Sequence, residues 1–183
     1  MTELSLNILD ICQNSIKANC TEVIILINED IKNDVLILDI SDNGCGMEKE
    51  FLEKVEDPFT TTRTTRKVGM GIPLLKMECE MAGGTFKIDS EKNVGTKIHC
   101  TFQYSNIDRL PLGNVCDTVL ALIRLNPDID FIYNHIVNGK SFEFSTKEVK
   151  NILGDVPLNN NEVLEFIKNY LDENIENLYG GII

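Results

Sequence analysis

An acid, an amide and a base recur along the first predicted helix, which covers residues 4–18. Asp10, Asn14 and Lys17 follow one another at helical spacing, so they share one stripe of the helix with Asn7. An Asn can offer its amide oxygen to a magnesium ion, a Lys brings positive charge to phosphate, and an Asp accepts a proton. The stripe therefore indicates a site for magnesium and a triphosphate, while a solvated surface stripe is the simpler alternative.

A carboxylate and two glycines follow the strand that we predict at residues 35–41. Asp42 ends this apolar run, and Gly44 and Gly46 follow it closely. Glycine has no Cβ and tolerates positive φ, so a loop built on it can approach a flat ligand. An ordinary turn would have the same sequence, so this motif depends on the others for its interpretation.

Basic and hydroxyl side chains fill the next segment, residues 57–67, without any apolar periodicity. Gly69 and Gly71 come directly after it, and Pro73 suits the first turn of a helix that Gly83 would end. The free N–H groups and positive dipole end at such a helix start attract anions. We therefore expect a loop that closes over phosphate, and a simple linker is the alternative.

Apolar spacing predicts short strands and helices around these motifs. Further strands are expected at 21–28, 85–89 and 96–103, and a short helix at 48–55. After residue 105 no motif with obvious chemistry follows. We therefore expect two domains, residues 1–105 and a small α/β domain of unknown role at residues 106–183. The second domain should contain a helix at 115–125, a hairpin around Asn138-Gly139 and two final helices.

Composition excludes several classes of protein. The net charge of −12 argues against nucleic acid as a partner, because a phosphate backbone requires clustered Lys and Arg. The six cysteines form no C-x-x-C pair, so neither a zinc nor an iron–sulfur site is indicated. No signal peptide and no apolar run of membrane-spanning length is evident. We expect a cytoplasmic protein with reduced thiols and no membrane contact.

Taken together, the motifs resemble those of the GHKL ATPase superfamily, which includes histidine kinases, gyrase B, Hsp90-type chaperones, mismatch-repair ATPases and anti-sigma kinases. The resemblance covers residues 4–103 and depends on boxes that occur in the same order as in the family. They are the N box at 9–18, the G1 box at 42–47, the F box and lid from 57, the G2 box at 69–72 and a last box at 95–96. The implied fold is an α/β two-layer sandwich of the Bergerat type, a mixed sheet with helices on one face.

The resemblance also implies ATP and Mg²⁺ as ligands and assigns a role to individual residues. Asn14 would bind the magnesium ion and Lys17 a phosphate, while Asp42 would accept the amino proton of adenine. Thr96 would lie near the same base, and Gly44 and Gly46 would leave room for it. The remaining nucleotide contacts implied by the boxes are Met47, Phe59, Thr61, Thr62, Arg63, Arg66, Gly69, Met70, Gly71 and Ile72.

Two departures from the family bear on the activity. Histidine kinases carry a helical phosphoacceptor domain before the N box, for which this sequence leaves no room, and we expect His99 and His135 to be structural. Hydrolytic members and anti-sigma kinases use a Glu as general base four residues before the Asn, where this chain has the shorter Asp10. Asp10 is therefore the predicted catalytic residue, with a simple surface acid as the alternative.

Two functions of different classes follow from these features. The first is an enzyme of the ATPase or protein kinase type that transfers the γ-phosphoryl group of ATP to water or to a partner protein, in a regulatory role in signal transduction. The second is a nucleotide-gated interaction module with little or no catalysis. A DNA-linked ATPase of the mismatch-repair kind fits less well because of the acidity and the missing transducer domain. The sequence does not decide between a monomer and a homodimer.

Overall fold

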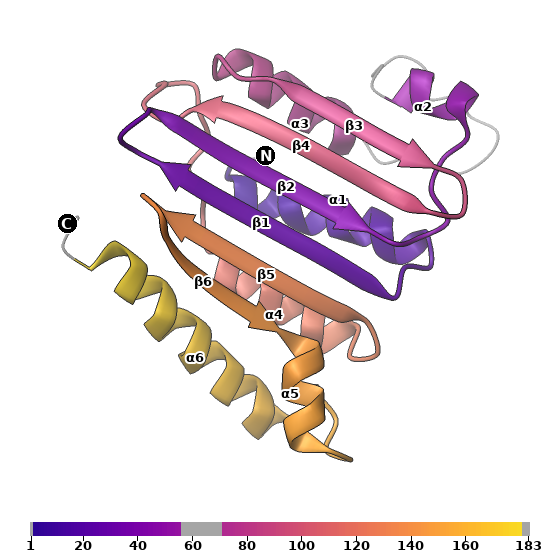
Figure 1. Ribbon diagram of the computed structural model, residues 1–183, viewed down its shortest axis with the longest axis vertical. Helices are drawn as coiled ribbons and strands as arrows, with labels where there is room; N and C mark the ends of the chain where they lie inside the picture. The colour runs from indigo at the N-terminus through magenta and orange to yellow at the C-terminus, as the bar shows by residue number, and fades with distance from the viewer. Residues whose placement is uncertain (1, 56–70, 181–183) are drawn as a thin grey trace.

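The computed structural model of the chain describes residues 2–55 and 71–180, and these form one mixed α/β sheet structure (Figure 1). The strands lie in the order β3-β4-β2-β1-β5-β6. They are β1 (Glu22–Asp30), β2 (Val35–Asp42), β3 (Phe86–Glu91), β4 (Gly95–Gln103), β5 (Asp130–Val137) and β6 (Lys140–Ser145). The helices are α1 (Leu4–Lys17), α2 (Lys49–Val55), α3 (Gly71–Met81), α4 (Val115–Leu125), α5 (Thr146–Leu153) and α6 (Asn161–Tyr179). The predicted fold class is confirmed.

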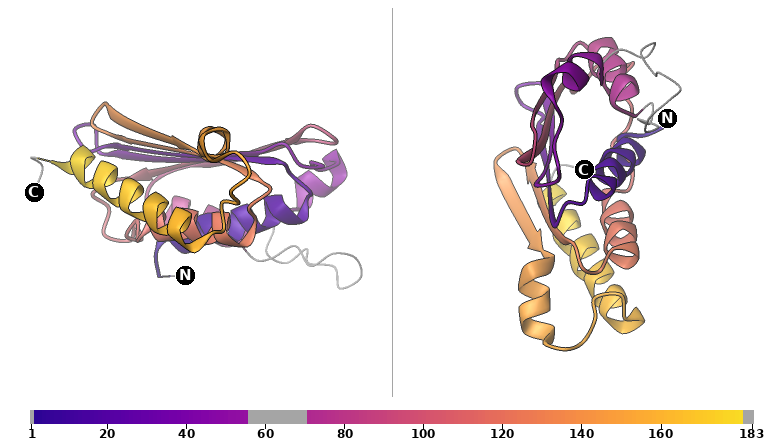
Figure 2. Two further views of the ribbon diagram at one scale, coloured as in Figure 1. Left: turned by 90° about the horizontal axis from the view of Figure 1, so that it is seen from below. Right: turned by 90° about the vertical axis from the view of Figure 1, so that its right-hand side faces the viewer.

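The helices α1, α3, α4 and α6 lie on one face of the sheet (Figure 2). Alternate residues of each strand face them, as the strand period of two requires, so that Val23, Ile25 and Ile27 of β1 are fully buried. Leu4 and Ile8 of α1 pack into the same cluster. The sheet and its helix layer therefore enclose the core between them, and α1 lies across the middle of this layer.

Strand pairing joins the two halves of the chain. β1 pairs antiparallel with β2 and, on its other side, parallel with β5, from Glu22 opposite Asp130 to Glu29 opposite Val137. The boundary predicted at residue 105 stays a prediction, but the residues beyond it extend the first sheet and share its hydrophobic cluster through Phe131. In the described residues no helix is long and apolar enough to cross a membrane.

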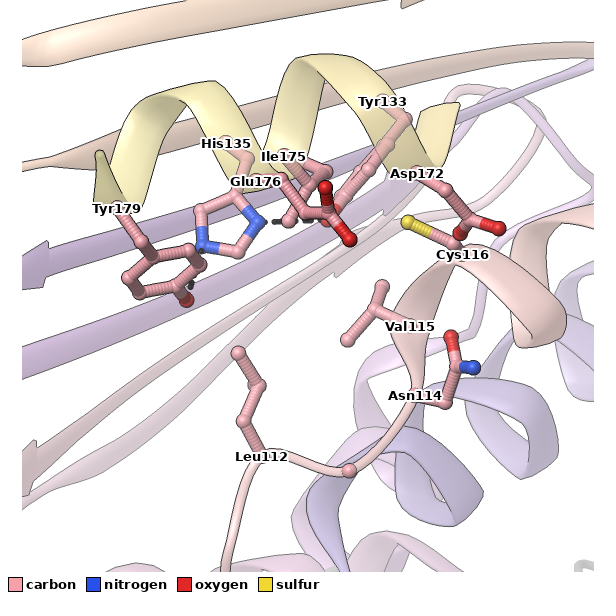
Figure 3. A pocket seen from close by; sticks show the side chains of 11 residues that line it. Leu112, Asn114, Val115, Cys116, Tyr133, His135, Asp172, Ile175, Glu176 and Tyr179 are labelled. Atoms are coloured by element: carbon pink, nitrogen blue, oxygen red, sulfur yellow. Dashed lines mark hydrogen bonds between the residues drawn. The ribbon is translucent and has the colours of Figure 1, made fainter. Parts of the chain in front are cut away.

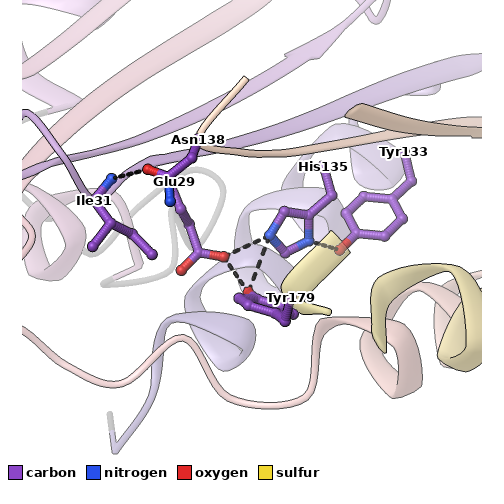
Figure 4. Close-up of polar contacts among 6 residues, drawn as sticks. All are labelled: Glu29, Ile31, Tyr133, His135, Asn138 and Tyr179. Carbon is purple, nitrogen blue, oxygen red and sulfur yellow. Dashed lines mark hydrogen bonds and ion pairs between the residues drawn. The ribbon is translucent and has the colours of Figure 1, made fainter. Parts of the chain in front are cut away.

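A buried polar network connects α6 to the neighbouring strands β1 and β5 (Figure 4). His135 of β5 is bonded through Nε2 to Glu29 of β1 at 2.7 Å and through Nδ1 to the Tyr133 hydroxyl at 2.7 Å. Tyr179 of α6 donates to the same Glu29 oxygen. Burial acts to raise the pKa of Glu29, but the hydrogen bonds from His135 and Tyr179 outweigh it and leave this pKa below its ordinary value.

At the start of α5, Thr146 rather than Ser145 makes a side-chain hydrogen bond. Ser145, Thr146, Lys147 and Glu148 match a capping-box pattern, yet the Ser145 side chain makes no capping hydrogen bond. The next residue is used instead, since the Thr146 hydroxyl accepts a hydrogen bond from the buried Phe131 N–H at 2.8 Å. The need to satisfy a buried N–H at the start of β5 is consistent with this arrangement. The Asn138-Gly139 turn has positive φ at both residues, as its hairpin requires.

Candidate nucleotide-binding site

Asp42 lies at the end of β2, on the face of the sheet that the helices cover. Its Oδ2 accepts a hydrogen bond from the Ser15 hydroxyl of α1 at 2.6 Å, and its Oδ1 accepts one from the Gly44 N–H at 2.8 Å. Each carboxylate oxygen has two lone pairs, so each can still accept from a ligand. The carboxylate is therefore held in one orientation by α1 and by its own loop, and it keeps acceptor capacity.

Thr96 is the direct cross-strand neighbour of Asp42, on β4. Its hydroxyl lies 2.9 Å from the Ser90 hydroxyl of β3, which also accepts from the Met47 N–H at 2.9 Å. Ser90 in turn donates to the Gly95 carbonyl at 2.9 Å. One serine thus connects the predicted contacts Met47 and Thr96, and the structure brings both to the end of the sheet where Asp42 lies.

The two glycines of the G1 box are required by the protein backbone around them. A Cβ on Gly44 would lie 2.9 Å from the Ala18 carbonyl oxygen at the end of α1. Gly46 has φ of 60°, and a Cβ there would lie 2.0 Å from the Glu91 carbonyl oxygen. The loop is therefore wedged between α1 and the β3–β4 turn, so these glycines serve close packing whether or not they also leave room for a base.

Asn14 carries a polar group that the fold leaves without a partner. Its Nδ2 is buried and has no hydrogen-bond partner among the described residues. A buried amide without a partner costs about 1–3 kcal/mol, so a ligand that bonds it would recover that free energy. Because the two ends of an amide can exchange by a flip, the group can present nitrogen to phosphate or oxygen to a metal ion. The donor set of Asn14, with Lys17 in the next turn, fits magnesium and phosphate.

Asp10 lies against the first residue of α3. A Cβ on Gly71 would come within 2.0 Å of the Asp10 Oδ2, so the carboxylate packs directly on the glycine. Ile72, next in the helix, is buried in the core and fixes this turn of α3. The contact can have two roles. A carboxylate near a helix N-terminus is stabilised by the helix dipole, and it is also placed to act on a ligand bound there.

Several predicted contacts lie outside the described residues. They are Phe59, Thr61, Thr62, Arg63, Arg66, Gly69 and Met70. Among the others, the structure brings Asp42, Met47 and Thr96 together at one end of the sheet. It places Asp10 beside Gly71, and Asn14 lies one helical turn from Asp10 along α1.

The described part of the chain includes a pair of open cavities of about 400 Å³ each. One is lined by Asp42, Thr96, Ser90, Gly95 and Leu52 of α2, among others, and so adjoins the predicted base contacts. Its volume is within the range of small-molecule sites. The other lies between the start of α4, β5 and α6, where Figure 3 shows its walls, and it contains none of the predicted site residues.

Sequence reasoning missed the residues that orient this site. Ser15 and Ser90 are single hydroxyls within a helix and a strand, and their hydrogen bonds to Asp42 and Thr96 depend on tertiary contacts. Asn7 shares the polar stripe of α1 but is 1% exposed, and its amide donates to Glu78 of α3. Burial raises the pKa of Glu78. Asn7 thus belongs to the α1–α3 contact, while Asp10, Asn14 and Lys17 make no such hydrogen bond to another of the described residues.

Comparison with known proteins gives the family. Residues 2–106 match the histidine kinase-, DNA gyrase B- and HSP90-like ATPases, and the chain belongs to this family. The match spans the α1 stripe, the G1 box and the last strand of the site. The sequence boxes described above therefore lie within the part of the chain that matches this ATPase family.

Two curated relatives are named as sensor proteins. The chain is 33% identical to the sensor protein RprX of Bacteroides fragilis over 104 residues, which are 53% of this chain and 20% of that protein. It is 32% identical over 83 residues to the autoinducer 2 sensor kinase/phosphatase LuxQ of Vibrio parahaemolyticus, covering 43% of this chain and 10% of that protein. The chain thus spans a fifth or less of these relatives.

Among solved structures, the Aquifex aeolicus MutL ATPase domain complexed with ADP has a similar fold, with a TM-score of 0.54. That similarity covers 92% of this chain and 88% of the MutL chain at 14% identity, so it shows the fold alone. It extends beyond the family domain and therefore includes strands and helices from both halves of the chain.

Proposed function

We propose that the protein binds ATP with magnesium and transfers the γ-phosphoryl group to water or to a side chain of a partner protein, in a regulatory role. Asp42 accepts the amino proton of the adenine base, with Thr96 beside it. Asn14 holds the magnesium ion and Lys17 a phosphate. The ion, when bound, neutralises charge on the phosphate oxygens.

The observation that carries this proposal is the set of polar groups that α1 contributes to the site. Ser15, near its end, is bonded to the carboxylate that reads the base. Asn14 carries the buried amide nitrogen without a partner, and Asp10, one turn earlier, packs on the first residue of α3. The residues that we assign to the base, the metal ion and the phosphate are thus held by a single rigid element, which supports a common ligand.

We assign the role of general base in phosphoryl transfer to Asp10. As general base it accepts the proton of the attacking water or hydroxyl, a role that requires it within hydrogen-bond reach of that group. Phosphoryl transfer depends largely on positioning and charge, so a small set of residues is enough. The contact with Gly71 supports a location at the start of α3, where free N–H groups favour phosphate.

A second candidate is a nucleotide-gated interaction module. In that case ATP changes the surface that a partner recognises, and hydrolysis is slow or absent. Asp10 then serves as an anchor for α3, since its carboxylate already contacts the helix start.

The experiment that separates the two candidates measures ATP turnover and ATP binding side by side, with magnesium, for wild type and Asp10→Asn. Loss of turnover with retained binding identifies the base. Binding without turnover in both forms supports the gated module or a kinase that lacks its substrate. Asp30→Asn, a matched change on the far end of β1, serves as the control and should alter neither quantity. Absence of ATP binding in wild type would refute the proposal.

A further inference from the structure

Ser90 of β3 takes part in three hydrogen bonds at the end of the sheet where β3, β4 and β2 lie side by side (Figure 1). Its hydroxyl oxygen lies 2.9 Å from the Met47 nitrogen, 2.9 Å from the Gly95 carbonyl oxygen and 2.9 Å from the Thr96 hydroxyl. A hydroxyl has one hydrogen to donate and two lone pairs that accept. The three contacts therefore use the whole hydrogen-bonding capacity of Ser90.

The direction of each of these bonds follows from the chemistry of the partner. The Gly95 carbonyl can only accept, so the single hydrogen of Ser90 points to it. The Met47 N–H can only donate, so it occupies one lone pair of Ser90. The Thr96 hydroxyl must then donate its own hydrogen to the other lone pair. Thr96 consequently meets a ligand with lone pairs alone, as an acceptor and not as a donor.

Two acceptors from neighbouring strands therefore line the cavity in which the adenine base is expected. Asp42 of β2 is the cross-strand neighbour of Thr96, and both line this cavity. The loop after Asp42 uses two of its N–H groups within the protein. The Gly44 N–H donates to Asp42 at 2.8 Å, and the Cys45 N–H donates to the Ala18 carbonyl at 2.9 Å.

Lys97 also lines this cavity and carries an ammonium donor, but it comes from the other side of the sheet. Successive residues of a strand point to opposite faces. Lys97 pairs with Ser41 and lies with it on the open face, the one that α1, α3, α4 and α6 do not cover. Thr96 and Asp42 face the helices, so acceptors form the polar wall on that side.

We propose that Ser90 determines the base specificity of the site, because it holds the Thr96 hydroxyl as an acceptor and so selects a purine with an amino group at C6 over a purine with a carbonyl there. The inference rests on the proposed function, in which Asp42 accepts one hydrogen of the adenine amino group. Thr96 accepts the second hydrogen, since side chains of cross-strand neighbours are close enough to share one group. A 6-oxo purine in the same position presents its oxygen to two acceptors, and that contact stays unsatisfied. Ser90 acts through Thr96 and is a positioning residue.

The first test compares the dissociation constants of ATP and of inosine triphosphate, a 6-oxo purine nucleotide, measured with magnesium by calorimetry on the full chain. Wild type should bind inosine triphosphate at least about tenfold more weakly than ATP. In Ser90→Ala the Thr96 hydroxyl can rotate and donate to the 6-oxo group, so this ratio should fall at least about fivefold. Ser90→Thr keeps the hydroxyl and should keep the wild-type ratio.

The outcomes of this test separate the inference from the proposed function. Equal binding of both nucleotides by wild type, or an unchanged ratio in a folded Ser90→Ala protein, would overturn the inference and leave ATP binding in place. Absence of ATP binding by wild type would overturn both.

The second test examines Thr96 directly and does not depend on the folding of Ser90→Ala. Thr96→Val removes the acceptor at nearly constant volume. It should weaken ATP binding at least about fivefold and leave the binding of inosine triphosphate within about twofold. Equal losses for both nucleotides would show that Thr96 donates as well as accepts, and would overturn the inference. In the Thr96→Val background, Ser90→Ala should not change the ratio further, because Ser90 acts through Thr96; a further fall would contradict that route.

The matched control is Thr101→Ala, near the other end of β4. The Thr101 hydroxyl accepts from the Thr85 N–H at 2.8 Å and lies 2.9 Å from the Thr85 hydroxyl, so the change removes the same kinds of bond that Ser90 makes. It should keep the wild-type ratio of the two dissociation constants. A fall equal to that of Ser90→Ala would show that losing any paired hydroxyl of the sheet alters the ratio, and would overturn the inference.

Discussion

Replacing Asp42 by Asn tests the base contact at nearly constant volume. The substitution keeps an oxygen to accept from the Gly44 N–H, and the Ser15 hydroxyl can rotate to accept from the new amide, so the loop stays anchored. The proposed acceptor for the adenine amino group, however, loses its charge, and one of its two oxygens is replaced by a donor. Hydrogen bonds to charged groups contribute about 1.5–3 kcal/mol, so ATP affinity should fall about 10- to 150-fold.

Isothermal titration calorimetry with Mg-ATP measures this loss directly. The matched control is Asp39→Asn, which removes the same charge from the same strand but on the open face, where it contacts His99. It should leave the dissociation constant within about twofold, since exposed charges contribute little at this distance. An unchanged affinity in Asp42→Asn, or an equal loss in both variants, would refute the assignment of Asp42.

Three further predictions concern other parts of the fold. Asn14→Ala should abolish the magnesium dependence of ATP binding, measured by titration with and without the metal; an unaltered dependence would contradict its role. Gly46→Ala should lower the free energy of urea unfolding by about 2 kcal/mol or more, because φ is positive and a backbone oxygen lies 2.0 Å from the new Cβ. Gly139→Ala, which meets nothing within 4 Å, should cost less, and equal losses would argue against the clash. Glu29 has a folded-state pKa below the ordinary 4.5, so its carboxylate stabilises the fold above that pH and less as pH falls through the folded pKa. Glu29→Gln should therefore be less stable than wild type at neutral pH, and the difference should shrink in thermal melts as the pH falls through the folded-state pKa of Glu29; a constant difference would refute this.

Local patterns were enough to predict the helices and strands closely. The helix at Val115–Leu125 has the predicted bounds, and the predicted hairpin turns at Asn138-Gly139, because strong periodicity and a marked turn define them. The parallel pairing of β1 with β5 was not predicted. It joins residues more than a hundred positions apart, and neither strand carries a sign of its partner.

In the candidate site, too, the residues were predictable from local motifs and their tertiary contacts were not. The candidate residues Asp42 and Asn14 were predicted from family motifs. The structure adds the hydrogen bond from Ser15 that orients Asp42. It also adds the hydrogen bonds through which Ser90 connects Thr96 to Met47. The packing of Asp10 on Gly71 could not be derived from sequence, because it depends on how α1 and α3 cross. The structure also gives Gly46 a packing role that the sequence did not indicate, since a Cβ there would meet the Glu91 carbonyl.

The parallel pairing of β1 has a consequence for the integrity of the nucleotide-binding half. Without residues beyond 105, β1 would become an edge strand of nine residues, with a free row of N–H and C=O groups and aliphatic side chains on both faces. A long, apolar edge of this kind is a template for pairing with other chains. By pairing β5 with β1, the C-terminal half occupies this edge. We therefore expect that a fragment without the C-terminal half would be insoluble.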